Sequence, residues 1–153
     1  NLSTLSFGDG KAGDLTIETR RLSIQDGAQI YAGTLGNGSG GQLSVYASES
    51  IEVAGRDRSS STLANFTSGA GQAGNLTVNT KKLMIRDGGV LSTQSVLSID
   101  ETGQVTVVPS GEGGNLMINA SDSVELIREG FIFSDTKGFG NAGNLKINTG
   151  RLV

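Results

Sequence analysis

The sequence predicts an all-β fold of the parallel β-helix (β-solenoid) type, with roughly five coils and three short strands in each coil. Three observations indicate it: a strand motif that occurs five times, apolar residues that alternate with polar ones, and glycine-rich segments between the repeats. The 153 residues include 24 glycines, five phenylalanines, two tyrosines and no tryptophan. This composition is typical of many short strands joined by tight turns. We therefore expect a single solenoid over residues 1–153.

The first segment of each coil begins at a glycine and continues as an alternating strand. It reads Gly-Asn-Leu-Thr-Val-Asn-Thr at 74–80, and related sequences occur at 13–19, 41–47, 114–120 and 143–149. The starting glycines are 28, 33, 40 and 29 residues apart, so the period is about 28 residues with insertions in two repeats. Stacked coils would form a column of the aliphatic residues Leu15, Leu43, Leu76, Leu116 and Leu145.

A second alternating segment follows and ends in a tight turn. It is seen as Leu22-Ser-Ile, Ile51-Glu-Val, Leu83-Met-Ile and Val124-Glu-Leu. Three of the turns that follow place a glycine after an acidic residue: Asp26-Gly27, Asp87-Gly88 and Glu129-Gly130. Glycine adopts positive φ without steric cost, so we expect each glycine to supply the backbone conformation of its corner.

A third segment completes the coil. Residues 29–35 align without gaps with 1–7, 62–68 and 131–137. The corner after it carries Gly-x-Gly-x-x-Gly, at 8–13, 36–41, 69–74 and 138–143. That pattern can mark a dinucleotide site, but a true fingerprint occurs once, between a strand and a helix. Four copies in register with the coils predict a repeated solenoid corner instead.

Polar positions repeat as well. Equivalent asparagines occur in two sets, Asn79/Asn119/Asn148 and Asn75/Asn115/Asn144, and stacked amides are expected to form hydrogen-bonded ladders. The repeats also alternate in type. The first segments at 13, 74 and 143 continue into basic residues and leucine, whereas those at 41 and 114 continue as Ala-Ser-Glu-Ser or Ala-Ser-Asp-Ser. The alternation indicates duplication of a pair of coils.

Two insertions, near 56–61 and 96–113, are expected to leave the solenoid. The second contains two alternating runs around a glycine-containing turn, which predicts a β-hairpin. Loops on a rigid scaffold often carry binding residues. Packing against the core, contact with a partner and a neutral role all remain open for this hairpin.

Composition argues against several kinds of chemistry. A formal charge of −3 disfavours binding to nucleic acid or to an anionic membrane, and no apolar run is long enough to span a bilayer. The chain has no cysteine and no histidine, so thiolate chemistry and a catalytic triad are excluded and zinc is disfavoured. Asp26 and Asp87 would lie about 9.6 Å apart, two coils along the stack, and turn formation explains both better than a glycosidase pair does. We expect no catalytic, cofactor-binding or metal-binding residues, and weak surface binding of calcium stays open.

Residues 74–88, Gly-Asn-Leu-Thr-Val-Asn-Thr-Lys-Lys-Leu-Met-Ile-Arg-Asp-Gly, are followed by a glycine-rich turn and a further Gly-Asn-Leu. This pattern resembles the repeats of filamentous-haemagglutinin-like proteins, above all cyanobacterial two-partner-secretion exoproteins with a haemagglutination-activity domain. The resemblance covers nearly the whole chain. It implies a right-handed parallel β-helix, secretion through an outer-membrane pore, and adhesion or filament formation at the cell surface. The family's secretion domain, with its Asn-Pro-Asn motifs, is absent, since Val108-Pro109 holds the one proline.

The expected function is a non-catalytic structural or adhesive segment of a secreted or cell-surface adhesin. Its partner would be a surface ligand such as a glycan or a neighbouring cell. The alternatives are a carbohydrate-active β-helix enzyme and a carbohydrate-binding module. The aromatic residues expected to be most exposed are Tyr31, Phe131, Phe133 and Phe139. Both terminal coils are incomplete in the sequence, so we expect a piece of a longer array with self-association through the open coil ends.

Overall fold

The computed structural model describes residues 1–56, 59–99, 102, 104–107 and 110–153. Residues 57–58 of the first expected insertion, and 100–101, 103 and 108–109 of the second, lie outside the described residues; these include Pro109. All regular secondary structure in the described part is β. No helix there is long and apolar enough to cross a membrane.

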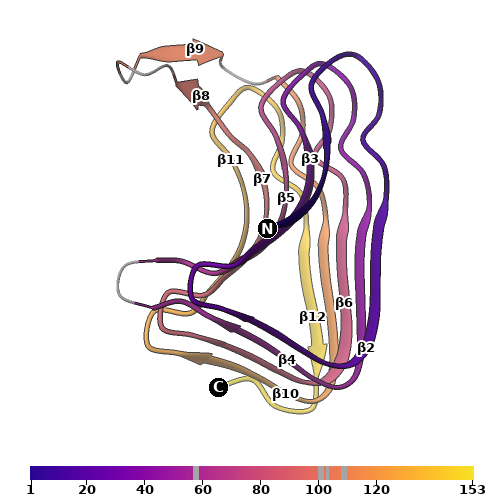
Figure 1. Ribbon diagram of the computed structural model, residues 1–153, viewed down its shortest axis with the longest axis vertical. Helices are drawn as coiled ribbons and strands as arrows, with labels where there is room; N and C mark the ends of the chain where they lie inside the picture. Colours follow the sequence, from indigo (N-terminus) through magenta and orange to yellow (C-terminus); the bar gives the residue numbers. More distant parts are fainter. Residues whose placement is uncertain (57–58, 100–101, 103, 108–109) are drawn as a thin grey trace.

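Two five-stranded sheets carry the fold, and every strand pair within them is parallel. The short-strand sheet contains, in order, β1 (Leu2–Ser6), β3 (Gln29–Thr34), β5 (Thr62–Thr67), β7 (Val90–Ser95) and β11 (Phe131–Thr136). The long-strand sheet contains β2 (Leu15–Gln25), β4 (Leu43–Ala54), β6 (Leu76–Arg86), β10 (Leu116–Ile127) and β12 (Leu145–Thr149). The chain passes from one sheet to the other and back, and this path builds a β-solenoid of about four turns (Figure 1).

The coil differs in two details from the sequence prediction. The expected first and second segments form one long strand, which bends where the register shifts, as between Ala47 and Ser50 in β4 (Figure 1). Each turn therefore holds two strands instead of three, because the backbone ladder continues around this corner. The five strands of a sheet are separated by four intervals, so the stack makes about four turns where roughly five were expected.

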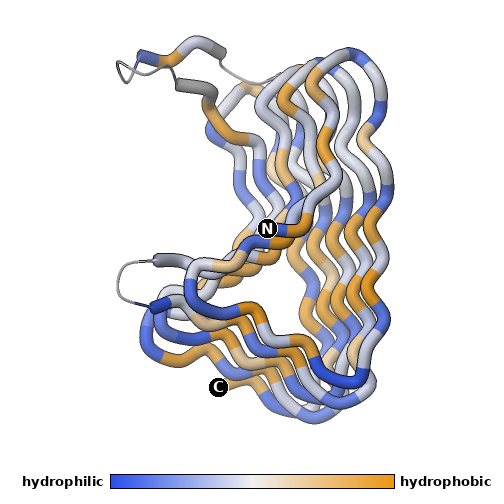
Figure 2. Tube along the Cα trace, viewed as in Figure 1, coloured by the Kyte–Doolittle hydropathy of each residue, from blue (hydrophilic) through white to orange (hydrophobic). Residues whose placement is uncertain are grey.

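The predicted aliphatic column is confirmed. Leu15 pairs with Leu43, Leu43 with Leu76, Leu76 with Leu116 and Leu116 with Leu145. The three central leucines are at most 1% exposed, and burial of each stabilises the fold by roughly 1.5–3 kcal/mol. Figure 2 shows the apolar residues of neighbouring turns side by side along the long strands.

The alignment of the third segments is also confirmed, since Gln29 pairs with Thr62 and Leu2 with Ile30. A further copy, β7, was not recognised in the sequence and lies between β5 and β11. Polar residues on the inner face of these strands reach across to the glycine-rich corner. Asn65 donates to the carbonyl oxygens of Gly41 (3.0 Å) and Asn75 (2.8 Å). Such bonds tie the two sheets together inside the solenoid.

The acidic turns are formed as predicted at two of the three places. Asp26 and Gly27 have φ of 55° and 78°, and Asp87 and Gly88 have φ of 54° and 83°. Both residues of each pair are thus left-handed, as in a type I′ turn. At the third turn the prediction for Gly130 is wrong, because the left-handed residues are Arg128 (φ 40°) and Glu129 (φ 62°).

The register of β10 on β6 fixes where this third turn falls. The register shift between Ala120 and Ser123 inserts one residue relative to β6, so that Ile127 pairs with Arg86. The following residues, Arg128 and Glu129, therefore occupy the places that Asp87 and Gly88 hold one turn earlier.

The Gly-x-Gly-x-x-Gly segments lie between a short strand and a long strand, and no helix follows them in the described chain. Their glycines stack directly on those of the preceding turn. A Cβ on Gly74 would lie 1.8 Å from the carbonyl oxygen of Gly41, and one on Gly71 would lie 2.0 Å from that of Gly38. None of these glycines has positive φ. Close packing on the preceding turn explains the glycines at 36, 38, 41, 69, 71, 74, 140 and 143, whereas an added Cβ at 8, 10 or 13, in the first turn, would meet no atom within 4 Å. A partial fifth copy, Gly111 with Gly114, joins the same columns.

Two segments lie outside the two parallel sheets. Arg56 and Ser59 form an isolated antiparallel bridge in the first inserted segment. In the second, β8 (Ser98–Ile99) pairs antiparallel with β9 (Val105–Val107) as a separate two-stranded sheet (Figure 1).

Candidate binding groove on the outer face

Asp26 and Asp87, the two carboxylates that a glycosidase pair would use, both form ion pairs. Asp87 accepts from Nε of Arg128 at 2.6 Å and also from Arg86, and Asp26 lies 3.5 Å from Nη1 of Arg56. Hydrogen bonds from Arg128, and then from Arg86, lower the pKa of Asp87 from 3.8 to about 2. The described residues contain no group of three or more histidine, cysteine, aspartate or glutamate side chains that could hold a metal.

A groove lies on the outer face of the long-strand sheet, where its strands bend. It has a volume of about 510 Å³ and crosses β4, β6, β10 and β12. Its described lining consists of Tyr46, Ala47, Ser48, Asn79, Thr80, Lys81, Asn119, Ala120, Ser121, Asn148, Thr149 and Gly150. The parallel register brings equivalent residues of four turns together here, so the groove follows the axis of the stack.

An asparagine ladder runs along this groove, as the sequence predicted. Asn119 donates from Nδ2 to Oδ1 of Asn79 at 2.9 Å, and Asn148 donates in the same way to Asn119 at 2.7 Å. An amide group has two N–H donors and an oxygen with two lone pairs. Since the ladder uses one donor and one lone pair of Asn119, the other donor and lone pair can bind a ligand.

The second predicted ladder lies at the start of the long strands and is longer than expected. Each side-chain oxygen accepts a backbone N–H of the next turn: the N–H of Asn115 donates to Oδ1 of Asn75, and that of Asn144 donates to Oδ1 of Asn115, both at 2.9 Å. Asp14 and Gln42 extend it, because their oxygens accept the N–H of Gln42 and Asn75 at 2.8 and 3.2 Å. The bond from Gln42 also lowers the pKa of Asp14. Because each oxygen bonds to backbone, this ladder holds the turns together.

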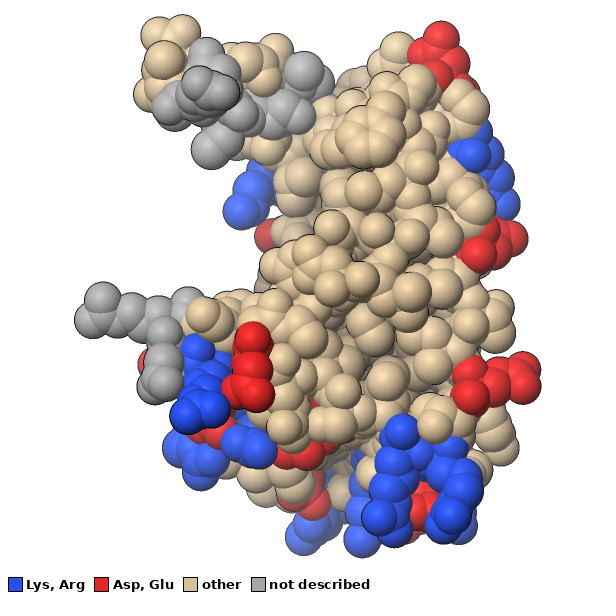
Figure 3. Space-filling view, in the orientation of Figure 1, with Lys and Arg blue, Asp and Glu red and all other residues tan. Residues whose placement is uncertain are grey.

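Charged residues beside the groove alternate in sign from turn to turn. Arg20 and Arg21 donate to the two carboxylate oxygens of Glu49 at 2.6 and 2.5 Å. These hydrogen bonds lower the pKa of Glu49, with that from Arg20 as the larger cause. The next turns carry Lys81-Lys82, then Asp122, then Arg151, and these charged side chains gather at the bend of the long strands (Figure 3). The two-coil repeat seen in the sequence thus coincides with this change of sign, and the structure shows an ion pair across it between the first two turns.

The lysines at this corner differ from the arginines. Arg20, Arg21 and Arg151 each pair with a glutamate. Lys81 and Lys82 form no ion pair within the part of the chain that the structure describes. Lys81 is the one charged residue in the described lining of the groove, so the groove is locally cationic although the whole chain has a charge of −3.

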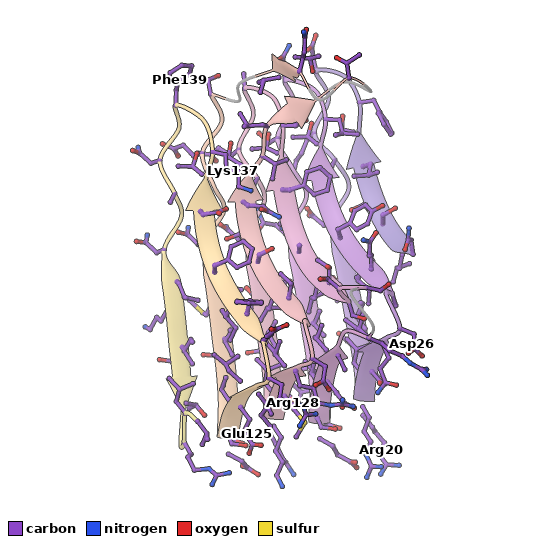
Figure 4. The ribbon with its side chains drawn as sticks, turned by 90° about the vertical axis from the view of Figure 1, so that its left-hand side faces the viewer. Arg20, Asp26, Glu125, Arg128, Lys137 and Phe139 are labelled. Atoms are coloured by element: carbon purple, nitrogen blue, oxygen red, sulfur yellow. The ribbon has the colours of Figure 1, made fainter. Side chains whose placement is uncertain are left out.

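The aromatic residues are distributed differently from the prediction. Phe131 and Phe139 are exposed, at 51% and 85%, and Phe139 lies far from the bend that Arg20 marks (Figure 4). Tyr31 and Phe133 are only partly exposed, and the ring of Tyr31 packs on that of Phe66, with centroids 5.8 Å apart.

Tyr46 was not predicted as a site residue. It is 55% exposed and lines the groove. Strand alternation places position 46 on the outer face, in register with Asn79. In the sequence, alignment of the segments that begin at Gly41 and Gly74 already places Tyr46 opposite Asn79, and this alignment could have identified it.

No known protein family, no curated protein and no solved structure matches this chain.

Proposed function

We propose that this chain is a non-catalytic structural and adhesive segment of a secreted or cell-surface protein of the filamentous-haemagglutinin-like type. The observation that carries the proposal is the continuity of the stack. Aliphatic columns, an amide-to-backbone ladder and ion pairs between neighbouring turns all run along one axis. A stack of this kind is stiff, and it presents the same outer positions again on each turn.

The proposal includes a right-handed coil and export through an outer-membrane pore. Connections between parallel strands of one sheet are right-handed in nearly all proteins, which supports the first point. The second rests on the resemblance of residues 74–88 to repeats of secreted exoproteins.

A carbohydrate-binding role is the second candidate, and one observation favours it. The groove at the bend combines an exposed tyrosine with a ladder of amides that keep free hydrogen-bonding capacity. Sugar rings offer both hydroxyl groups and apolar faces, which suit such a lining.

Adhesion is tested with beads that carry the whole folded chain, in flow over surfaces coated with bacterial cells or with cell-surface polysaccharide. We expect the beads to be retained, and beads with heat-unfolded chain to detach as readily as bare beads. The absence of catalysis is tested by incubation with the same polysaccharides and assay of new reducing ends. Formation of product in proportion to protein concentration would overturn the non-catalytic proposal, and equal detachment of all beads would overturn the adhesive one.

A further inference from the structure

The groove at the bend of the long strands has the chemistry of a site for one class of polymer. We infer that it binds a linear acidic polysaccharide, laid along the axis of the stack. This inference rests on the proposed adhesive function, for which it supplies the ligand.

The preference for a linear ligand follows from the repeat of the site. Asn79, Asn119 and Asn148 lie on successive strands, and neighbouring strands are about 4.8 Å apart. Each turn therefore presents one amide at a regular interval along a single line. A polymer with hydroxyl groups at regular intervals can bond to several amides at once, whereas a compact ligand would reach only one or two.

The preference for sugar rings follows from the rest of the lining. Tyr46 stands in register with Asn79 at one end of the ladder and is 55% exposed. Its ring offers an apolar face and a hydroxyl group. The other residues near the amides, such as Ser48, Thr80 and Ser121, have small side chains, while Ala47 and Ala120 are buried in the core.

The preference for an acidic polymer follows from the cations. Lys81 lines the groove, and a neighbouring hollow of about 360 Å³ is lined by Lys81, Lys82 and Arg21 together with Glu49, Ser50 and Asp122. The arginine is already paired with Glu49, but the two lysines have no ion-pair partner in the described chain. Carboxylate groups of a bound polymer would pair with these lysines, as Glu49 pairs with Arg20 and Arg21.

Single-stranded nucleic acid is the competing anionic polymer, and the lining does not favour it. Proteins bind its bases by stacking them on a series of aromatic side chains in a strongly basic channel. The described lining here has one aromatic residue, Tyr46, and one charged residue, Lys81. Amide and hydroxyl groups dominate the rest of the polar lining, as in sites for hydroxyl-rich ligands.

The test uses the whole chain and a fluorescently labelled oligogalacturonate, with binding measured by fluorescence anisotropy. We expect binding that weakens as salt is added. Lys81→Gln and Tyr46→Ala should each raise the Kd by roughly fivefold, equivalent to about 1 kcal/mol. Lys137→Gln and Phe139→Ala are the matched controls, because they remove an exposed lysine and an exposed aromatic ring away from the bend (Figure 4). Both controls should leave the Kd within about twofold. Thermal unfolding followed by circular dichroism checks that all four variants are folded.

Three results would overturn the inference: equal binding of a neutral cello-oligosaccharide, equal effects of Lys81→Gln and Lys137→Gln, or competition by single-stranded DNA at the same concentration as oligogalacturonate. If beads adhere but no oligogalacturonate binds, the groove inference fails and the adhesive function stands. If oligogalacturonate binds in solution but beads do not adhere, the adhesive function fails and the groove inference stands.

Discussion

Glycine at the strand-joining corner is required by the distance between turns. The carbonyl oxygen of Gly41 would lie 1.8 Å from a Cβ at position 74. A side chain there would have to push two hydrogen-bonded turns apart. Gly13 is the equivalent residue of the first turn, and an added Cβ there meets no atom within 4 Å.

Gly74→Ala should therefore lower the free energy of unfolding by about 1–3 kcal/mol or more, the usual effect of overpacking a tightly packed site. Gly13→Ala changes the same residue type in the same column and should be close to neutral. Urea unfolding of both variants provides the measurement. If the two substitutions have equal effects, close stacking is not the reason for glycine at this corner.

The carboxylate of Asp87 should make the fold sensitive to acid. Its pKa is lowered from 3.8 to about 2, mainly by Arg128 and then by Arg86. A carboxylate with a lowered pKa stabilises the folded state above its ordinary pKa, and the contribution is lost as the pH falls through the folded value. The loss should thus occur between pH 3.8 and about 2.

Asp87→Asn should flatten the pH dependence of stability in this range and lower stability at neutral pH. Asparagine tolerates the left-handed backbone at this position, so the turn should form. Arg128→Gln removes the larger cause of the shift and should flatten the profile in the same direction. Urea midpoints across the acid range test both, and an unchanged profile in Asp87→Asn would refute the assignment.

At the scale of the strand, each long strand is matched to its neighbours by charge as well as by hydrogen bonds. The bend carries basic residues on β2 and β6 and acidic ones on β4 and β10. The pairing of Arg20 and Arg21 with Glu49 shows the consequence at atomic distances. Exposed ion pairs are individually weak. A positive charge in place of Glu49 on β4, however, would lie between the basic residues of β2 and those of β6.

Glu49→Lys should therefore lower the urea midpoint at low salt, with a large part of the loss recovered on addition of salt, because screening weakens repulsion between exposed charges. Asp9→Lys makes the same change of charge at an exposed position of a glycine-rich corner and serves as the control. A salt response of equal size in both variants would show that net charge, and not the alternation along the bend, is responsible.

At the scale of the whole molecule, one aliphatic core runs through all turns, so no turn can bury its inner face alone. Leu76 lies at the centre of its column and is fully buried. Arg56, by contrast, has a side chain that is 71% exposed and a 3.5 Å ion pair with Asp26. A substitution at Leu76 should therefore affect the packing of the whole stack, and one at Arg56 should affect it little.

Leu76→Asp should abolish cooperative unfolding, since a buried and unpaired carboxylate costs more than a domain of this size can tolerate. Arg56→Ala should change stability by no more than about 1 kcal/mol, as expected for a surface ion pair. Thermal melts followed by circular dichroism compare them. Similar melting of both variants would contradict the assignment of inner and outer faces.

Much of this architecture was predictable because each turn repeats residues that must stack. The leucine column and both asparagine ladders follow from equivalent positions, and the structure confirms them. The copies at Val90–Ser95 and Gly111–Gly114 were missed because their sequences diverge while their backbones keep the register. The groove was also missed, since Tyr46, Lys81 and Asn148 are far apart in the chain and unremarkable individually.

The sequence by itself determined the fold class, the period and the inner face of each strand, because side-chain alternation and repeat spacing are properties of the chain. Only the tertiary structure decided that two predicted segments form one bent strand and that the third turn moves to Arg128 and Glu129. It also placed Lys81 beside an amide ladder, without an ion pair to any described residue. These features depend on which residues pair between turns. A one-residue shift such as that in β10 changes this pairing, and it can be located only once the strands are stacked.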